Sequence, residues 1–454
     1  MKFQLKFVGL IFILAFAAVT FAQSRNPHVD LKETRLANGL RVITVEDHNA
    51  PVIAVNVSYN VGSRNEKPGR TGFAHLFEHM MFQGSENVGK SEHFILVYNN
   101  GGTMNGTTNE DRTNYFEGLP SNQLDLALFL EADRMRSLAV TQENLDNQRN
   151  AVQEERRIGL DNAAYGKSGE MQQSLMYDNF AYKHDTIGSM DDLNAASVDD
   201  VRAFFKMYYA PNNAVLTLVG DFKPALALAL IKKNFESIPR QPDPPAVDMT
   251  EPDQKAERRA SIDDPWARAA RISIAYKTVP GNTADFYALQ VLGNVLGGGV
   301  SSRLNQKLVR EKEMVTSANT FVQEMRGVGG FYIIATPRSN FKNDAVEAAI
   351  YDEVARLQKE PIADWELQKA KSGARRNFVN SLQSSLGRAN AIGQAAVYYG
   401  DPNLINTRLD KVMAVTKEDV QRVANKYLVQ TNRTVVITIP KAPMGRGMGI
   451  GMQQ

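Results

Sequence analysis

Two histidines and a glutamate lie within five residues of one another near the start of the chain. The run His75-Leu76-Phe77-Glu78-His79 is an H-x-x-E-H cluster. On a helix, His75 and His79 would share one face, with Glu78 beside them. Two neutral imidazoles can hold a zinc ion, and a carboxylate beside it can take a proton from a water that the ion polarises. The pentad therefore predicts a zinc hydrolase, with packed histidines on an ordinary helix as the alternative.

A catalytic zinc site needs a third protein ligand and leaves its fourth position to water. The other histidines fall in segments that we expect to be loops: His28, His48, His93 and His184. The adjacent Glu154 and Glu155 lie in a polar stretch, 143–157, that we expect to be helical. Neighbouring residues on a helix point about 100° apart, so only one of the two can face an ion. The pattern leaves both open, beside the alternative of a solvated, self-paired Glu-Glu-Arg-Arg face.

The segments around the pentad alternate between strand and helix patterns. Residues 72–83 have apolar residues at helical spacing, which places the pentad on a helix. Stretches rich in β-branched residues predict strands at 40–45, 52–59 and 214–220. Further helices are expected at 124–135, 143–157 and 222–235.

The second half of the chain repeats this order without histidines. A strand at 272–276 precedes Pro280-Gly281 and a helix at 284–296, and each half closes on a β-branched strand, the last at 434–439. We interpret the chain as α+β, a duplicated sheet-plus-helix unit in which one copy kept a metal site. The alternative is that any two α+β segments align this loosely.

The composition between the halves marks a boundary. Residues 238–262 are rich in proline, aspartate and glutamine, which is typical of a linker. We therefore expect a zinc-binding unit at 27–237 and a second unit without metal at 263–440. The Gly/Met-rich tail, 441–454, is expected to be disordered.

The first 22 residues have the layout of a secretory signal peptide. Two lysines precede an apolar run from Phe7 to Phe21, and small residues surround a possible cut after Ala22. The run is short of the roughly 20 residues that span a bilayer, which favours cleavage over an uncleaved anchor. We expect export, to a bacterial periplasm or beyond the cell, with no membrane span in the mature protein.

Charge and cysteine content narrow the chemistry further. The net charge is +2, which gives no reason to expect nucleic acid as a partner. The chain has no cysteine, so a metal must be held by histidines and carboxylates.

Together these motifs resemble the pitrilysin/insulinase family of inverted zinc peptidases. The chain is most similar to its single-chain-half members, such as processing-peptidase β subunits and their bacterial relatives. The resemblance covers nearly the whole mature chain. Besides the pentad and the glutamate of segment 149–155, it is carried by segments 38–42, 102–108, 111–116, 186–189, 209–213 and 297–304.

The resemblance implies a role for individual residues. It implies Zn²⁺ held by His75, His79 and Glu155, with Glu78 as the general base. It also implies that Asn105 binds the backbone of a peptide substrate, which joins an edge strand; on the pattern alone, Asn105 could be a turn residue among glycines. Two chains of this family would close like a clamshell around a chamber that admits unfolded peptides.

The chain departs from the family pattern at two places. Gln148 stands where members often carry a glutamate that steadies a metal ligand, which predicts altered support for the ligand rather than loss of zinc. In the second half the family has an Arg and a Tyr seven residues apart that stabilise the oxyanion. Here these positions are Arg310 and Ser317.

Serine is too short to replace a phenol that reaches across a cavity. An intact metal set beside an incomplete oxyanion set leads to the hypothesis of a heterodimer, in which a related second subunit supplies the Arg/Tyr pair; a homodimer fits less well. The alternative is a misplaced register, with the Arg/Tyr pair lying elsewhere in the chain. A non-catalytic scaffold or assembly subunit that retained the fold is the alternative to an enzyme.

Overall fold

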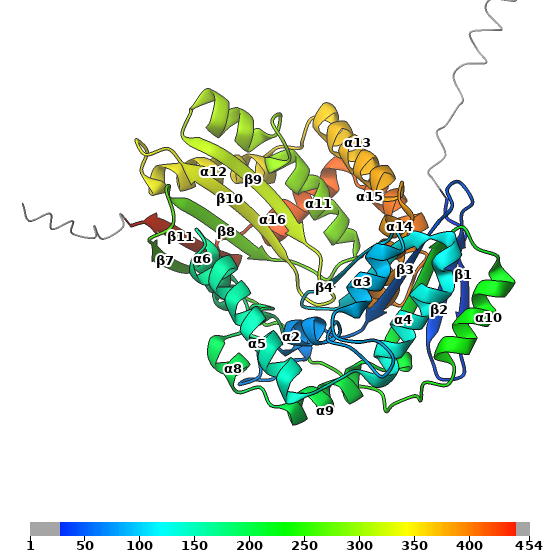
Figure 1. Cartoon of the computed structure of the whole chain (residues 1–454). Helices are drawn as coiled ribbons and strands as arrows, with labels where there is room; N and C mark the ends of the chain where they lie inside the picture. Colours follow the sequence, from blue (N-terminus) through cyan, green and yellow to red (C-terminus); the bar gives the residue numbers. More distant parts are fainter. Residues whose placement is uncertain (1–27, 442–454) are drawn as a thin grey trace, which may run out of the picture.

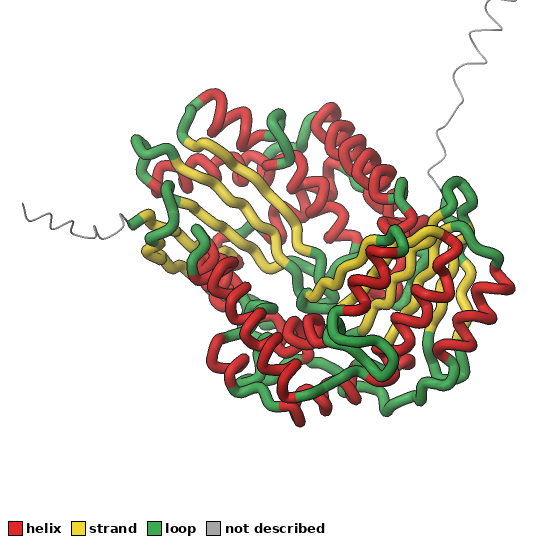
Figure 2. The backbone as a smooth tube through the Cα atoms, in the orientation of Figure 1, coloured by secondary structure: helices red, strands yellow, loops and turns green. Residues whose placement is uncertain are grey.

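The computed structural model describes residues 28–441 and contains two β-sheets, each covered by helices (Figures 1 and 2). The first has strand order β1-β2-β6-β3-β5-β4 and the second β7-β11-β8-β10-β9. The expected signal segment, 1–22, and the expected tail beyond Lys441 lie outside the described residues.

The first sheet and its neighbouring helices come from the first half of the chain. Its strands are β1 (Lys32–Arg35), β2 (Arg41–Glu46), β3 (Val52–Tyr59), β4 (Thr103–Thr108), β5 (Thr113–Pro120) and β6 (Ala214–Gly220). The helices are α2 (Phe73–Met80), α3 (Glu92–Asn99), α4 (Leu124–Ser137), α5 (Gln142–Arg156), α6 (Gly166–Met176), α7 (Phe180–Lys183), α8 (Met190–Asn194), α9 (Val198–Tyr208) and α10 (Pro224–Phe235).

The second sheet comes from the second half. Its strands are β7 (Arg258–Asp264), β8 (Arg271–Lys277), β9 (Val315–Gln323), β10 (Gly330–Pro337) and β11 (Arg433–Pro440). The helices are α11 (Ala284–Gly297), the π-helical turn η5 (Asn305–Glu311), α12 (Asn343–Lys359), α13 (Asp364–Ser381), α14 (Ser385–Tyr399), α15 (Leu404–Ala414) and α16 (Lys417–Tyr427).

The two sheets have the same topology, which confirms the predicted duplication. In each, the first and last strands of the repeated unit pair in parallel: β2 with β6, and β7 with β11. Three antiparallel strands follow in the same order, β3-β5-β4 in the first sheet and β8-β10-β9 in the second. The helix that follows β3 in the first unit is α2, and the helix that follows β8 in the second unit is α11. Of these two helices, only α2 carries the pentad.

The two units exchange one helix each. Although α14 belongs to the second half, it packs on β3 and β6 of the first sheet, where Ala389 and Ile392 join a buried cluster with Ala54 and Val219. In the other direction, α6 packs on β8 and β11. The central strands of the first sheet are therefore covered on both faces, which explains why β6 is apolar at almost every position and buried throughout.

The range expected to be linker, 238–262, agrees only in part with the structure. Residues 236–257 form neither helix nor strand, but β7 begins at Arg258, inside the range expected to be linker. The β9–β10 turn also docks on the first unit, because the Arg326 backbone N–H donates to Asp111 (2.8 Å) and that of Gly327 donates to the Tyr182 hydroxyl (2.9 Å). The halves are consequently locked together rather than tethered by the linker alone.

One predicted loop is wrong. His93 lies on α3 and is buried, because the helix turns His93 and Val97 towards the sheet while Ile95 and Tyr98 stay exposed. The preceding Gly-Lys-Ser residues are typical of a loop, and the helix that follows them is short.

An ionic cluster at the surface joins α11 to α16 and predicts a pH dependence of stability. Asp285 accepts hydrogen bonds from Tyr427 (2.5 Å), Arg422 (2.6 Å) and Lys426 (3.0 Å). Burial raises the pKa of Asp285, but these bonds outweigh it and bring the pKa to about 2. Since this is below the ordinary value, the stabilisation is complete above about pH 4 and is lost as the pH falls towards 2.

We therefore expect Asp285→Asn to lower the free energy of unfolding by about 1–2 kcal/mol at pH 7 and by less at pH 3. Urea unfolding followed by circular dichroism at the two pH values measures this difference. Asp344→Asn, at an exposed position in the first turn of α12, is the matched control. An equal loss at both pH values would contradict the assignment.

Candidate zinc site

The pentad helix α2 is anchored at its N-terminus by a carboxylate from outside the helix. The Glu66 side chain accepts from the backbone N–H groups of Gly72 (3.0 Å) and Ala74 (2.8 Å). His184 in turn contacts Glu66 through Nε2 (2.9 Å). These bonds satisfy N–H groups that every helix start leaves free. His184, one of the spare histidines, thus holds the helix rather than a metal.

Gly72 permits this tight start. Its φ is 84°, which favours glycine, and a Cβ there would lie 2.5 Å from the Ile187 carbonyl oxygen.

Three side chains from two helices converge beside α2. Glu155 Oε2, from α5, lies 3.6 Å from His75 Nε2 and 3.4 Å from His79 Nε2. Donors about 2.0–2.1 Å from a tetrahedral zinc ion lie roughly 3.4 Å apart, so the spacing fits a zinc ion shared by all three. Glu154 points elsewhere and pairs with Arg157 (3.0 Å). Of the two glutamates that the helical pattern left open, Glu155 is thus the one that lies beside both histidines.

Polar contacts, more than apolar ones, hold α5 in this orientation. Arg149 donates to the Leu193 carbonyl (3.0 Å), and Gln153 donates to the Asn194 side chain (2.7 Å). One turn further, Arg156 donates to the Gly188 carbonyl (2.7 Å). The expectation of a solvated Glu-Glu-Arg-Arg face therefore holds for Glu154 and Arg157 but not for Arg156, which is buried.

The protonation state of His75 and the hydrogen bond made by His79 both favour metal binding. Burial, together with the neighbouring His79, lowers the pKa of His75 to about 4, so its imidazole is neutral at pH 7. Gln148 Oε1 lies 3.3 Å from His79 Nδ1, and the Gln148 amide donates to Asn147 (2.6 Å). The amide can thus accept from Nδ1–H, which leaves His79 Nε2 as the donor to a metal.

Glu78 lies beneath the histidines, against strand β4. It is 9% exposed, and its Oε2 accepts from the Thr108 hydroxyl (2.6 Å). Burial raises the pKa of Glu78, and the Thr108 bond opposes that rise. Gly106 makes room for the carboxylate, since a Cβ there would lie 3.0 Å from Glu78 Oε1. Sequence reasoning gave Thr108, Gly106 and Glu66 no role, because their contacts with α2 are made only in the fold.

Known proteins match the chain along both halves. A family model described as Insulinase (Peptidase family M16) matches residues 41–165, and one described as Peptidase M16 inactive domain matches residues 195–374. Zinc protease PqqE of Helicobacter pylori is 31% identical over 433 residues, which cover 95% of this chain and 97% of that protein. The chain belongs to the insulinase family, peptidase family M16.

Other M16 proteins share its length or its fold. The mitochondrial-processing peptidase subunit beta of Lentinula edodes is 24% identical, over 90% of each chain. A crystal structure of a protease from Helicobacter pylori superposes with a TM-score of 0.87 at 31% identity, covering 91% of this chain and 100% of that one. The periplasmic protease PqqL of Escherichia coli matches in fold at 18% identity and a TM-score of 0.74; the match covers 92% of this chain and 48% of PqqL.

The M16 chain carries Asn105 on the outermost strand of its first sheet. Strand β4 pairs with β5 on one side, and no other described strand pairs with its second edge. Asn105 is exposed, and its side-chain oxygen accepts from the backbone N–H of Gly106 (2.9 Å). An edge strand next to Glu78 has free backbone groups that an extended peptide could pair with.

Arg310 and Ser317 are not brought to this site. Arg310 is exposed on η5, and among residues 28–441 no hydrogen bond or ion pair joins it to the pentad or Glu155. Ser317 lies on β9, where its hydroxyl donates to Thr336 (3.3 Å). In this M16 chain the two positions predicted to stabilise the oxyanion, Arg310 and Ser317, are therefore separate from the three candidate metal ligands.

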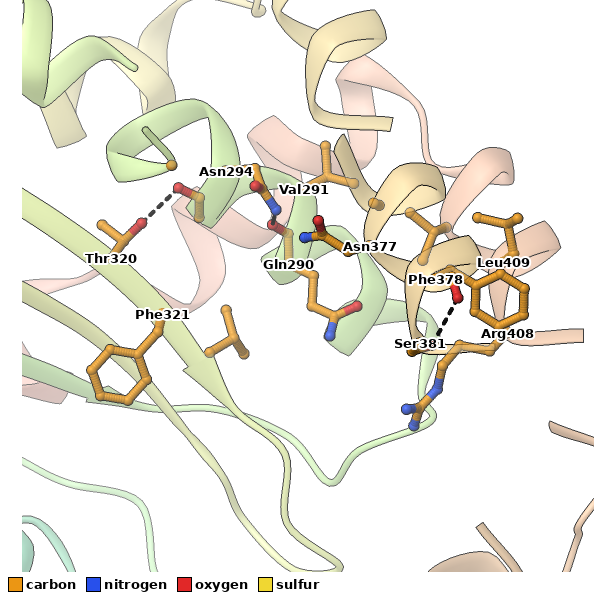
Figure 3. Close-up of a pocket in the computed structure, with 15 residues that line it drawn as sticks. Gln290, Val291, Asn294, Thr320, Phe321, Asn377, Phe378, Ser381, Arg408 and Leu409 are labelled. Atoms are coloured by element: carbon orange, nitrogen blue, oxygen red, sulfur yellow. Dashed lines mark hydrogen bonds between the residues drawn. The ribbon is translucent and has the colours of Figure 1, made fainter. Parts of the chain in front are cut away.

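The M16 chain also has a pocket in its second unit, of about 470 Å³ (Figure 3). It is lined from α11, β9, α13 and α15, with Gln290, Asn294, Thr320, Asn377 and Arg408 among its polar residues. No histidine or carboxylate lines it, so it does not reproduce the metal site in the second copy.

Among the helices of residues 28–441, none combines the length and the apolar character of a membrane span.

The choice of Glu155 over Glu154 is directly testable. We expect Glu155→Gln to weaken zinc binding by more than about 100-fold, because it removes a charged donor, and Glu154→Gln to leave it within about twofold. Competition with a fluorescent zinc chelator measures both affinities, with circular dichroism as a check on folding. Similar affinities for the two variants would overturn the assignment.

Proposed function

We propose that this chain is a zinc metalloendopeptidase that hydrolyses unfolded peptides outside the cytoplasm. His75, His79 and Glu155 would hold the zinc ion, and Glu78 would be the general base. The observation that carries the proposal is the convergence of the Glu155 carboxylate on both Nε2 atoms at 3.4–3.6 Å, with the Glu78 carboxylate adjacent. The names of the zinc-protease relatives support it.

The chemistry divides between the metal and the chain. A zinc ion, when bound, supplies Lewis acidity that polarises a water and the scissile carbonyl. Glu78 accepts the proton from that water and returns it to the leaving amine. Thr108 holds Oε2 of Glu78, so Oε1 is the oxygen that takes the proton. Burial keeps the carboxylate basic enough for this role.

Substrate would bind as an added strand. The free edge of β4 passes beside Glu78, and a peptide paired with it would run antiparallel or parallel to Thr103–Thr108. Such pairing requires an extended substrate backbone, which unfolded peptides provide and folded domains do not. Asn105 would bind the substrate backbone near the cleaved bond, since it is exposed on this strand.

The proposal includes a second subunit that supplies the oxyanion donors. The short Ser317 side chain on β9 bonds within its own sheet and supplies no phenol that could extend from it. One related chain is called subunit beta of a processing peptidase, and the chain matches only about half of PqqL. Both observations support a heterodimer of the clamshell kind. Arg310 would then contribute little in this chain without its Tyr partner.

The incomplete oxyanion set also favours the second candidate, a non-catalytic assembly subunit. Such a subunit would not need bound zinc. Export is part of the proposal and rests on the pattern of residues 1–22, with the periplasmic PqqL as a structural neighbour.

The enzyme and the assembly subunit differ in their response to Glu78→Gln. We expect this variant to bind zinc like the wild type but to cleave a quenched fluorescent peptide about 10²–10⁴-fold more slowly, because the base is lost. Glu154→Gln is the matched control and should retain both properties. Equal activity of the Glu78→Gln variant and the wild type would contradict the proposal that the chain is an enzyme with Glu78 as its base.

The heterodimer is tested at position 317. We expect the purified chain alone to be slow and Ser317→Tyr to raise its rate by about tenfold or more, because a phenol restores an oxyanion donor. Ser317→Phe has the same ring without the hydroxyl and should give no gain. A full rate from the chain alone, with no gain from Ser317→Tyr, would contradict the heterodimer, as would purification from its native host without any related chain.

A further inference from the structure

We propose that His93, Glu117 and Glu131 form a second metal site, which holds a divalent cation such as zinc in the core of the first unit. The three residues come from α3, β5 and α4. Their ligand atoms lie within 4.8 Å of one another, and their exposures are 4%, 0% and 1%. The site is distinct from the pentad.

Atoms of this cluster need a partner that the described protein does not supply. His93 Nε2 and both carboxylate oxygens of Glu117 are buried without a hydrogen-bond partner among residues 28–441. Native proteins rarely bury a carboxylate unpaired, because it loses its hydration without compensation. A bound cation would satisfy all three of these atoms at once.

The spacing in the cluster points to a shared ion. His93 Nε2 lies 3.5 Å from Glu117 Oε2, which exceeds the roughly 2.7–2.9 Å of a direct charged hydrogen bond. It matches the 3.4–3.6 Å between the donor atoms at the pentad site. It also matches the roughly 3.4 Å expected between two donors on one tetrahedral zinc ion.

Arg134 orients Glu131 but does not pair with Glu117. Its Nε donates to Glu131 Oε2 (3.1 Å), and its guanidinium stacks 4.3 Å from the centre of the Tyr115 ring. Among residues 28–441 no hydrogen bond or ion pair joins Arg134 to Glu117, which leaves Glu117 without an arginine or lysine partner.

The site would be structural rather than catalytic. Its three residues are sealed from solvent, whereas a catalytic zinc keeps a position open for water and substrate. Glu117 pairs with Met104 across the β4–β5 ladder, one residue from the Asn105–Phe116 pair. An ion there would tie β5 to α3 and α4, directly behind the edge strand that carries Asn105.

The experiment counts metal in the full chain with the pentad disabled. We expect wild-type protein to carry about two divalent cations per chain, and the His75→Ala/His79→Ala variant to retain about one, measured by plasma mass spectrometry for zinc, manganese and iron. Adding Glu117→Gln should remove the retained ion. Adding Glu110→Gln instead, a glutamate between β4 and β5 that accepts from Gln323, should not.

A second measurement keeps the proposal testable if the Glu117→Gln variant does not fold. If Glu117→Gln prevents folding, anomalous scattering at the metal edge from crystals of the His75→Ala/His79→Ala variant locates the ion, and a peak between His93 and Glu117 supports the site. A folded His75→Ala/His79→Ala variant without metal would overturn the proposal and leave water or a shared proton as the occupant; a peak elsewhere would also overturn it. Peptidase activity enters none of these measurements, so the proposed function and this site can fail separately.

Discussion

The carboxylate of Glu66 at the start of α2 is the interaction on which the candidate site most depends. An eight-residue helix has too few internal hydrogen bonds to be stable alone, and its first N–H groups are unpaired. Glu66 pairs two of them and is itself held by His184. The helix therefore presents His75 and His79 in fixed positions, as a site that must bind an ion tightly requires.

The same helix has to be held from its other side. α5 approaches through polar contacts with the segment around α8, so the direction of Glu155 is set by where Arg149, Gln153 and Arg156 bond. Glu78 is set by β4, through Thr108 and the space left by Gly106. Three elements thus converge on α2. A change in any of them would displace a donor atom by enough to matter, since metal ligands tolerate errors of only a few tenths of an ångström.

What the sequence could predict follows from how local each feature is. The strands 52–59 and 214–220, and the helix of the pentad, were predicted within about three residues at each end, because periodicity and turn residues are local signals. The exchange of α6 and α14 could not be predicted, because an apolar helix face does not specify which sheet it covers. Likewise, helical geometry left Glu154 and Glu155 open; only the family resemblance favoured Glu155, and its distances to the two histidines are a property of the fold.

The two copies differ in the helix at the position of the pentad. In the second unit, α11 is apolar and buried along most of its length, and its one acidic side chain, Asp285, pairs with α16. In the first unit, α2 carries three ionisable side chains, and Glu117 on β5 and Glu131 and Arg134 on α4 are buried as well. Each buried charge needs a partner, and each partner restricts the elements that carry it. In the first copy these partners hold α2, β4 and α5 in the one arrangement that brings the candidate metal ligands together.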